Sequence, residues 1–483
     1  MTSAEQFDLI VIGSGPAGEK GAAQAAYFGK KVALVELAPQ VGGACVHTGT
    51  LPSKTLREAA LYLTGFRRRE LYGLTLDLDR QASIRALTGR LQHVTAGQVA
   101  QISRNLDRHH VTLVSGRATF VSPNEIAVIG ADGGEQRRLA ASTFLIATGS
   151  SPLRPAGVPF SDPDVEDSDT ILQLDRIPDA LAVVGGGVIG CEYACIFAAL
   201  GTRITIIEGR SALMGFLDSE ISDSLKSELE DDGHAVRLGD AVTTVQRVPD
   251  GPLRLTLKSG TELLVDKVLY SAGRGGNTAG LGLDVAGVTL DPRGRIIVDD
   301  HFRTSTAHIY AAGDVIGNPA LASVSMEQGR VAMCHAFDLS YKTQVAELTP
   351  FGVYTIPEIS MVGATEDDLK KRGVTYAVGR TMLEQNARGQ ITGERRGLLK
   401  LLFDVPSKRL LGAHMIGEGA TELIHVAQMV MTFGGTIDVF IDSVFNFPTL
   451  SEAYKYAAYD GLAHLARLAP AYPPAPPPSG FDK

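Results

Sequence analysis

The chain has 483 residues, which is too long for one simple hydrophobic core, so we expect two to four domains. Its net charge of −9 and the lack of a long basic run argue against nucleic acid or an anionic membrane as a partner. No apolar run is long enough to span a bilayer, and the four cysteines lack the spacing of metal ligands or secreted disulfides. We therefore expect a cytoplasmic protein without a bound metal.

The first forty residues alternate between strand and helix patterns. An apolar run at 7–12 predicts a strand, small residues at 16–29 predict a helix, and residues 31–36 predict a second strand. No basic residue precedes the first run, which leads directly into glycines, so it indicates a strand and not a signal peptide. This order is typical of the start of a dinucleotide-binding domain.

The remaining chain divides into three further stretches. Short strands with a hairpin at residues 132–134 precede a proline-punctuated linker, and a second strand–helix–strand pattern begins at residue 181. Loops and strands return near residue 275, and residues 350–465 form a third kind of unit that contains a strand at 398–403. The proline-rich end, Pro470 to Lys483, is expected to be a flexible or polyproline tail. Helices are predicted at 52–64, at 81–108, after Pro319, at 420–432 and at 450–466.

A glycine fingerprint joins the first strand to the first helix. In Gly13-Ser14-Gly15-Pro16-Ala17-Gly18, Gly13 permits a tight turn, Gly15 lets the backbone approach a pyrophosphate, and Gly18 lets the helix pack on the strand. The helix N-terminus offers free N–H groups to phosphate. Glu36 ends the second strand, where a carboxylate can accept hydrogen bonds from ribose hydroxyls.

The fingerprint occurs a second time, as Gly185-Gly186-Gly187-Val188-Ile189-Gly190, and Glu208 closes the strand that follows its helix. Glu208 suits the free ribose 2′-hydroxyl of NAD(H), whereas Arg210 could reach the 2′-phosphate of NADP(H). The alternative is a duplicated structural turn without ligands, which requires that chance placed both acids. We therefore predict two dinucleotide sites.

Four further segments carry a resemblance to a known family. They are Ala147-Thr148-Gly149-Ser150, Gly273-Arg274 with Asn277-Thr278, Ala311-Ala312-Gly313-Asp314, and the run from Gly42-Gly43-Ala44-Cys45 to Pro52-Ser53-Lys54. With the two fingerprints, they resemble the pyridine nucleotide–disulfide oxidoreductase family over nearly the whole chain. In that family, the aspartate matching Asp314 hydrogen-bonds the flavin ribityl chain, and the helix matching Cys45 to Lys54 lies beside the isoalloxazine.

The resemblance implies an α/β fold with two Rossmann-like domains, for FAD and for NAD(P), and a C-terminal α+β dimerisation domain. It also implies FAD, NAD(H) and NADP(H) as cofactors and a homodimer or larger homo-oligomer. The expected boundaries are 1–155 and 275–346 for the two FAD-binding segments, 156–274 for the NAD(P)-binding domain, 347–468 for the dimerisation domain and 469–483 for the tail. The residues expected to bind the cofactors are Gly13, Gly15, Gly18, Glu36, Gly43, Thr148, Gly149, Gly313, Asp314, Gly185, Gly187, Gly190, Glu208, Arg210 and Gly273.

Two departures from the family pattern concern thiol chemistry. Disulfide reductases of this family carry two cysteines on the redox helix, but here Cys45 keeps the first position and Thr50 occupies the second. A threonine hydroxyl forms neither a disulfide nor a useful thiolate. The family's C-terminal His-Pro-Thr, whose histidine exchanges protons with the thiol, is here Phe447-Pro448-Thr449, although the downstream Glu452 remains.

The candidate catalytic residues are Lys54, Glu192, Thr50 and Cys45. In the family, the lysine and glutamate matching Lys54 and Glu192 form an ion pair near the flavin N5, where the cation would stabilise negative charge on reduced flavin. Taken without the motif, they would be a surface lysine and a glutamate favoured by a helix N-terminus. Cys45 without a partner is more consistent with an inert thiol.

These losses are similar to the pattern of the soluble, FAD-containing pyridine nucleotide transhydrogenases, in which one nicotinamide reduces FAD and another reoxidises it at the same site. Two alternatives remain open: an NADH-dependent diaphorase that reduces quinones or dyes, and a non-catalytic FAD/NAD redox sensor.

Three minor patterns have simpler explanations. His47 could donate a proton near the flavin, but a hydrogen bond to backbone explains it as well. Cys191 and Cys195, four apart on a helix, are expected to pack on one face. Glu418, Glu422 and His425 have helical spacing for a metal, but we favour a solvated or interface face.

Overall fold

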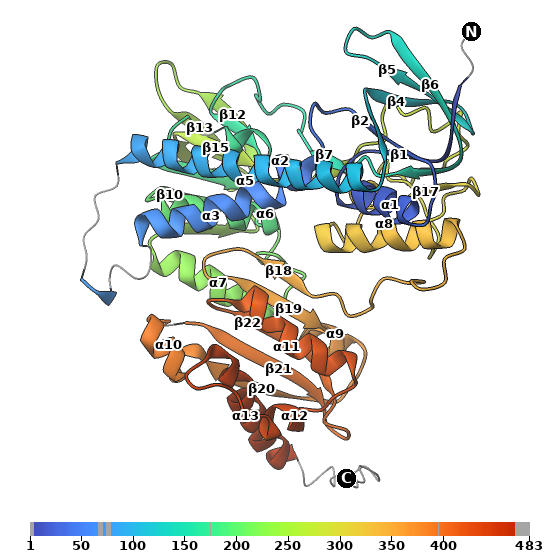
Figure 1. Ribbon diagram of the computed structural model, residues 1–483. Helices are drawn as coiled ribbons and strands as arrows, with labels where there is room; N and C mark the ends of the chain where they lie inside the picture. The colour runs from blue at the N-terminus through green and yellow to red at the C-terminus, as the bar shows by residue number, and fades with distance from the viewer. Residues whose placement is uncertain (1–3, 66–70, 74–78, 174, 395, 469–483) are drawn as a thin grey trace, which may run out of the picture.

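The computed structural model describes residues 4–65, 71–73, 79–173, 175–394 and 396–468. The predicted tail from Pro470 to Lys483 lies outside the described residues. Three main sheets organise the chain, and in Figure 1 the third, drawn in orange and red, lies below the other two. Within the described ranges, no helix is long and apolar enough to cross a membrane.

The first sheet has seven strands and contains the first predicted βαβ unit. Its strands β1, β2, β3 and the second half of β6 are parallel, and β17 lies parallel to β6. Both faces of β1 are covered, because its apolar run from Leu9 to Ile12 is buried throughout, as expected for a parallel sheet. The first half of β6 forms the predicted hairpin with β5. The strands are β1 Glu5–Ile12, β2 Val32–Glu36, β3 Thr112–Ser115, β4 Arg117–Ser122, β5 Glu125–Ile129, β6 Glu135–Ile146 and β17 Ile309–Ala311.

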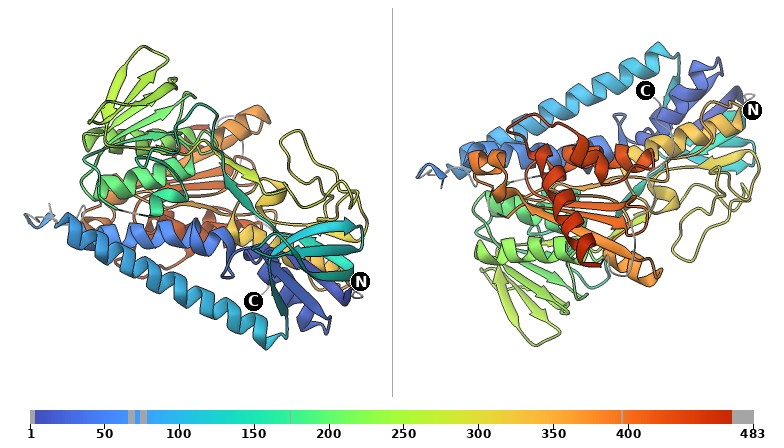
Figure 2. Two further views of the ribbon diagram at one scale, coloured as in Figure 1. Left: turned by 90° about the horizontal axis from the view of Figure 1, so that it is seen from above. Right: turned by 90° about the horizontal axis from the view of Figure 1, so that it is seen from below.

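Helices α1 (Pro16–Tyr27) and α8 (Ala322–Ala336) pack against each other beside this sheet. A Cβ atom on Gly329 would lie 2.2 Å from the carbonyl oxygen of Ala17, so the two backbones touch. Helices α2 (Gly43–His47), α3 (Thr50–Thr64) and α5 (Arg80–Arg108) follow β2, and Figure 2 shows α3 and α5 side by side. The predictions at 52–64, at 81–108 and after Pro319 are confirmed.

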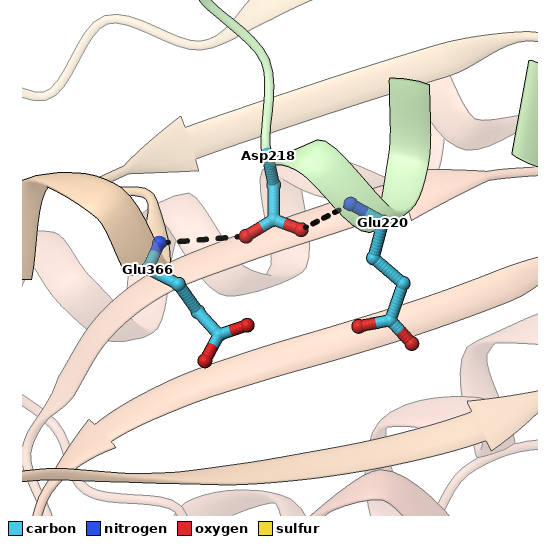
Figure 3. A group of neighbouring side chains, drawn as sticks. All are labelled: Asp218, Glu220 and Glu366. Carbon is cyan, nitrogen blue, oxygen red and sulfur yellow. Dashed lines mark hydrogen bonds between the residues drawn. The ribbon is translucent and has the colours of Figure 1, made fainter. Parts of the chain in front are cut away.

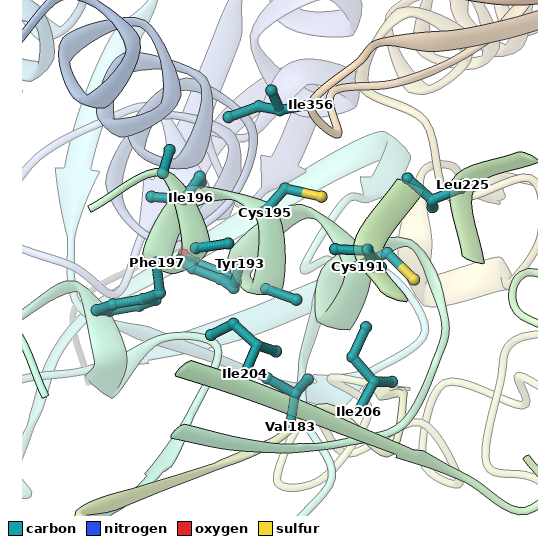
Figure 4. Close-up of a cluster of buried hydrophobic side chains, with 14 of the residues drawn as sticks. Val183, Cys191, Tyr193, Cys195, Ile196, Phe197, Ile204, Ile206, Leu225 and Ile356 are labelled. Atoms are coloured by element: carbon teal, nitrogen blue, oxygen red, sulfur yellow. The ribbon is translucent and has the colours of Figure 1, made fainter. Parts of the chain in front are cut away.

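The second sheet has five parallel strands in the order β11-β10-β9-β15-β8. Helix α6 (Val188–Ala199) crosses it and is buried over almost its whole length, so Cys191 and Cys195 both lie in the hydrophobic core (Figure 4). The predicted packing of these cysteines is confirmed. The strands are β8 Val165–Asp167, β9 Ala180–Val184, β10 Arg203–Glu208, β11 Ala235–Leu238 and β15 Lys267–Tyr270.

Two smaller sheets were not predicted. An antiparallel sheet of β12 (Val242–Arg247), β13 (Leu253–Leu257) and β14 (Glu262–Val265) follows β11. A short ladder pairs β7 (Ser150–Pro152) with β16 (Arg274–Gly276), so the chain that leaves the first sheet meets the chain that returns from the second.

The third sheet is antiparallel, in the order β18-β19-β22-β21-β20. Its strands are β18 Phe351–Val353, β19 Ile359–Gly363, β20 Tyr376–Met382, β21 Leu398–Asp404 and β22 Leu410–Ile416. The predicted strand at 398–403 and helix at 420–432 are confirmed, whereas the predicted helix at 450–466 begins with a 3-10 turn. The helices of this unit and the short 3-10 turns of the chain are α9 Glu366–Lys371, α10 Ala387–Thr392, α11 Ala420–Thr432, α12 Asp438–Asp442, α13 Ala453–Leu468, η1 Thr170–Leu172, η2 Asp314–Ile316, η3 Leu383–Gln385 and η4 Leu450–Glu452.

A buried lysine joins the second and third units, which are the parts of the chain built around the second and third sheets. Asp218 and Glu220, at the start of α7 (Ser219–Asp231), meet Glu366 of α9, and their carboxylate oxygens lie within 4.8 Å of one another (Figure 3). Such a group could hold a metal ion, but the ammonium of Lys400 on β21 lies 2.8, 3.0 and 2.7 Å from Asp218, Glu220 and Glu366. Lys400 therefore supplies the positive charge that all three carboxylates share, and Arg380 adds a second pair to Glu220 at 2.9 Å.

The Lys400 cluster generates a stability prediction. Lys400 and Asp218 are both almost completely buried, so Lys400→Met leaves Asp218 without its cation while Glu220 keeps Arg380, and we expect a loss of about 3–5 kcal/mol in the free energy of unfolding. The matched control is Lys408→Met: this lysine pairs with Asp438 but is 34% exposed, and its loss should cost about 0–1 kcal/mol. Urea unfolding compares the two variants, and equal losses would contradict the role of burial.

Candidate active site

The first fingerprint forms a turn that is tightly packed at Gly13 and Gly18 and open at Gly15. Gly13 has φ +100°, and a Cβ there would lie 2.4 Å from the carbonyl oxygen of Ala147. A Cβ on Gly18 would lie 1.9 Å from the oxygen of Gly13, so α1 and β1 pack by backbone contact. At Gly15 a Cβ would meet no atom of the described residues within 4 Å. The open position lies at the start of α1, where free N–H groups favour phosphate.

A cavity of about 430 Å³ opens at this turn. Its lining includes Ser14, Gly15 and Gly42, Cys45 of α2 and Gln101 of α5. Gly43 begins α2 against the fingerprint, because its Cβ would lie 2.8 Å from the Cα of Gly15. The opening and the residues around it fit the diphosphate of a dinucleotide.

Glu36 holds this turn together. Its carboxylate accepts hydrogen bonds from the backbone N–H groups of Ser14 and Ala38, both at 2.8 Å, and from the Ser14 hydroxyl. The same hydroxyl accepts a bond from the N–H of Gly42 at 2.9 Å. Glu36 therefore lies beside the open glycine, and its contact with a ribose stays a prediction.

Three segments that are distant in sequence interlock near the cavity. The Thr148 hydroxyl donates to the carbonyl of Asn277 at 2.7 Å, while the Asn277 amide returns a bond to the Thr148 carbonyl at 3.0 Å. Arg274 donates to the hydroxyl of Ser150 at 2.9 Å, which in turn donates to the carboxylate of Asp314 at 2.7 Å. The resemblance named these segments, but it assigned no role to Ser150.

Backbone conformation explains the glycines in these segments. Gly149, Gly273 and Gly313 have φ of +68°, +110° and +82°, in the left-handed region that favours glycine. The N–H of Gly313 donates to the side chain of Gln328 on α8 at 2.8 Å, which fixes the turn before Asp314.

The second fingerprint repeats the geometry of the first. Gly185 has φ +109°, and a Cβ on Gly190 would lie 2.0 Å from the Gly185 oxygen. Within the part of the chain that the structure describes, a Cβ on Gly187 would meet nothing within 4 Å. The position of the open glycine is the same in both turns. This repetition is consistent with a second dinucleotide site at the start of α6.

Glu208 is buried next to this turn and carries an arginine. It accepts a bond from the N–H of Gly186 at 2.8 Å, and the Arg210 guanidinium donates to both of its oxygens at 3.0 Å. Hydrogen bonding by Arg210 lowers the pKa of Glu208 to about 2, so the carboxylate is charged at neutral pH. Arg210 thus folds back onto Glu208, and most of its side chain remains exposed.

The expected single redox helix is two helices in the structure, because α2 ends at His47 and α3 begins at Thr50 after Gly49. Cys45 of α2 and Thr50 of α3 nevertheless meet. Burial raises the pKa of the Cys45 thiol, and a hydrogen bond with the Thr50 side chain and the nearby Lys54 charge oppose that shift. Cys45 is therefore a neutral thiol at pH 7, and it is a free cysteine, as are Cys191, Cys195 and Cys334. The Nε2 of His47 lies 2.9 Å from the carbonyl oxygen of Val41, which is the backbone contact expected from the sequence.

An ion pair between α3 and α6 lies one turn beyond Thr50. The Lys54 ammonium lies 2.8 and 2.6 Å from the two carboxylate oxygens of Glu192. The Lys54 side chain is 24% exposed and that of Glu192 only 5%. The two residues are 138 positions apart, so the pair joins the two dinucleotide-binding units.

Two residues discussed from the sequence lie away from this site, and one residue of the site was not predicted. Phe447 is 72% exposed on the third unit. His425 pairs with Gln428 of its own helix. Sequence reasoning missed Tyr354, whose ring covers Lys54 with 4.8 Å between the ammonium and the ring centroid. No local pattern marks this tyrosine, which reaches the site from a third unit.

Comparisons with known proteins agree with this geometry. The family model described as pyridine nucleotide-disulphide oxidoreductase matches residues 7–329, and the dimerisation-domain model of the same name matches residues 349–458. The chain is 47% identical to the soluble pyridine nucleotide transhydrogenase of Mycobacterium bovis over 96% of this chain and 98% of that one. It is 42% identical to that of Yersinia enterocolitica over 95% and 98%.

Two solved structures are also similar. LpdA from Mycobacterium tuberculosis superposes with a TM-score of 0.85 at 27% identity, over 94% of this chain and 99% of that one. The HOCl-induced flavoprotein disulfide reductase RclA from Escherichia coli gives 0.83 at 26%, over 93% and 98%.

The Glu208–Arg210 pair generates a prediction of coenzyme preference. A 2′-phosphate facing Glu208 would meet like charge, at a cost of about 1 to 4 kcal/mol at about 4 Å depending on effective dielectric. Arg210 already neutralises part of that charge. We expect NADH to reduce bound flavin more efficiently than NADPH, with both active.

Two variants distinguish the effect of Glu208 from that of Arg210. Both are compared by the rate of flavin reduction in stopped-flow experiments with NADH and with NADPH. Glu208→Ala frees Arg210 and should shift the efficiency ratio toward NADPH, whereas Arg210→Ala should shift it toward NADH. A wild type that clearly prefers NADPH would show that Glu208 does not face the ribose.

Proposed function

Because the chain belongs to the pyridine nucleotide-disulphide oxidoreductase family, we propose that it is an NAD(P)+ transhydrogenase that moves hydride between nicotinamide nucleotides by way of FAD. One observation carries this proposal: Thr50 occupies the position next to Cys45 where a disulfide reductase needs its second thiol, while Lys54 and Glu192 are intact. The relatives at 42–47% identity are named as soluble transhydrogenases, which supports it.

The residues around both open glycines fit dinucleotides. FAD would be held at Gly13, Gly15, Gly18, Glu36 and the interlocked segments around Asp314. When bound, it would accept hydride and give it up again. The nucleotide substrate would be held at Gly185, Gly187 and Gly190, with Glu208 at its ribose.

The chain's own residues provide charge and exclude competing chemistry. The Lys54 ammonium, held by Glu192, offers positive charge where negative charge develops during reduction. The Cys45 thiol stays protonated because burial raises its pKa, so no thiolate is present to react with a substrate disulfide. Without a thiolate to accept electrons, these residues leave the nucleotide site, or an acceptor that approaches from solvent, as the place where hydride would be delivered.

The proposal includes a cytoplasmic homodimer or larger homo-oligomer. The matched dimerisation domain supports self-association. The segment from residue 429 to 447 presents exposed apolar side chains suited to an interface, namely Met429, Phe433, Val439, Val444 and Phe447. The free cysteines fit a reducing compartment. The domain boundaries near 155, 274 and 346 are part of the proposal.

The missing second thiol generates a prediction of electron capacity. Anaerobic titration of wild type should require one two-electron equivalent per FAD, without a thiolate-to-flavin charge-transfer band, and Cys45→Ser should require the same. Thr50→Cys places a sulfur where the hydroxyl now contacts Cys45, so a disulfide should raise the requirement to two equivalents. A wild type that consumes four electrons would show that another cysteine pair is redox-active.

Steady-state kinetics test the proposed function. The sequence contains one nucleotide fingerprint besides that assigned to FAD, so the acceptor must enter the site that the donor has left. We expect parallel double-reciprocal plots with NADH and the thio-analogue of NAD+, and competition by each product against the opposite substrate. Hydride should leave and return on the same face of the nicotinamide. Intersecting plots would contradict a single shared site.

A further inference from the structure

We propose that Tyr354 of the third unit is a positioning residue for Lys54, and that its ring holds the ammonium in place and limits its contact with water, so that it raises the reduction potential of bound FAD. The inference rests on the FAD site proposed above. It concerns a residue that lies outside both glycine fingerprints and the redox helix.

Tyr354 contacts both members of the ion pair. Its ring faces the Lys54 ammonium at 4.8 Å, within the range of a cation–π interaction. Its backbone N–H donates to Glu192 Oε1 at 2.9 Å, the oxygen that also lies 2.8 Å from Lys54. Burial raises the pKa of Tyr354, so the ring stays neutral and presents an electron-rich face. Lys54 is thus held by Glu192 and covered by the ring of Tyr354.

The loop between β18 and β19 gives Tyr354 little freedom. Arg57 of α3 donates to the carbonyl of Thr355 at 2.9 Å, and Thr421 donates to Glu358 at 2.7 Å. Ile356 is inserted into the core of the second sheet above α6, as Figure 4 shows. These anchors all follow Tyr354, and the paired strand β18 ends directly before it, so the ring is fixed over Lys54.

The ion pair lies next to the cofactor cavity. Cys45 and Leu51 line that cavity, and Lys54 follows Leu51 by three residues on α3, which places both on one face of the helix. The charge of Lys54 also lowers the pKa of Cys45, although burial of the thiol has the larger effect in the opposite direction. The ammonium field thus reaches the cavity.

Shielding by the ring strengthens that field. Water screens a charge that is open to it, and the Lys54 side chain is already 24% exposed with the ring present. If the ring is removed, water gains access and the side chain gains rotamer freedom, so less positive charge acts on the reduced cofactor. The expected result is a lower midpoint potential.

A double-mutant cycle on the holoenzyme tests this inference by equilibration with a redox dye of known potential. Tyr354→Leu retains the backbone N–H but removes the ring, and it should make flavin reduction about tenfold less favourable, equivalent to about 30 mV for two electrons. Tyr354→Met should behave in the same way, whereas Tyr354→Phe retains the ring and should keep the wild-type potential. In a Lys54→Met background, Tyr354→Leu should cause no further shift.

Two outcomes would overturn the inference: a wild-type potential in both Tyr354→Leu and Tyr354→Met, or an equal shift with and without Lys54. The Met variant serves if the Leu variant does not fold. The potential is measured without a nicotinamide acceptor, so this test stands even if the kinetics contradict transhydrogenation. Conversely, parallel kinetics with no change in potential would remove the role of Tyr354 and leave the proposed function intact.

Discussion

The ion pair between Lys54 and Glu192 is the interaction on which the proposed chemistry depends. It joins helices α3 and α6, which belong to the two dinucleotide-binding units, and Tyr354 adds a contact from the third unit. A nearly buried carboxylate needs its cation, since an unpaired charge in such a place is costly. The arrangement of the three units and the charge beside the cofactor cavity therefore depend on one another, and the site is a property of the whole chain.

The residues around the ion pair determine which reactions this site can support. Cys45 meets a hydroxyl in place of a thiol, and burial keeps its own proton bound. Charge stabilisation by Lys54 does not require a thiol, so hydride transfer can persist where disulfide exchange is lost. The second fingerprint has the same open glycine as the first, and Glu208 lies beside it with Arg210 attached. The protein thus retains the parts needed for nucleotide chemistry.

The sequence predicted what short-range patterns encode. The glycine fingerprints placed two turns, because only glycine tolerates the left-handed backbone at Gly13 and Gly185 and the close contact at Gly18 and Gly190. The family resemblance supplied the Lys54–Glu192 pair. The Lys400 cluster, the ladder of β7 with β16 and the ring of Tyr354 were not predicted, since each depends on contacts between residues far apart in sequence. No periodicity or spacing announces such contacts.

The central claim is that reduced enzyme delivers its hydride to a second nicotinamide nucleotide. The most direct measurement is the ratio of two anaerobic turnover rates with NADH as donor, one with the thio-analogue of NAD+ and one with a quinone as acceptor. We expect the nucleotide analogue to be reduced at least as fast as the quinone. A quinone rate more than about a hundredfold higher, equivalent to roughly 2.7 kcal/mol of barrier, would contradict transhydrogenation and leave a diaphorase in its place.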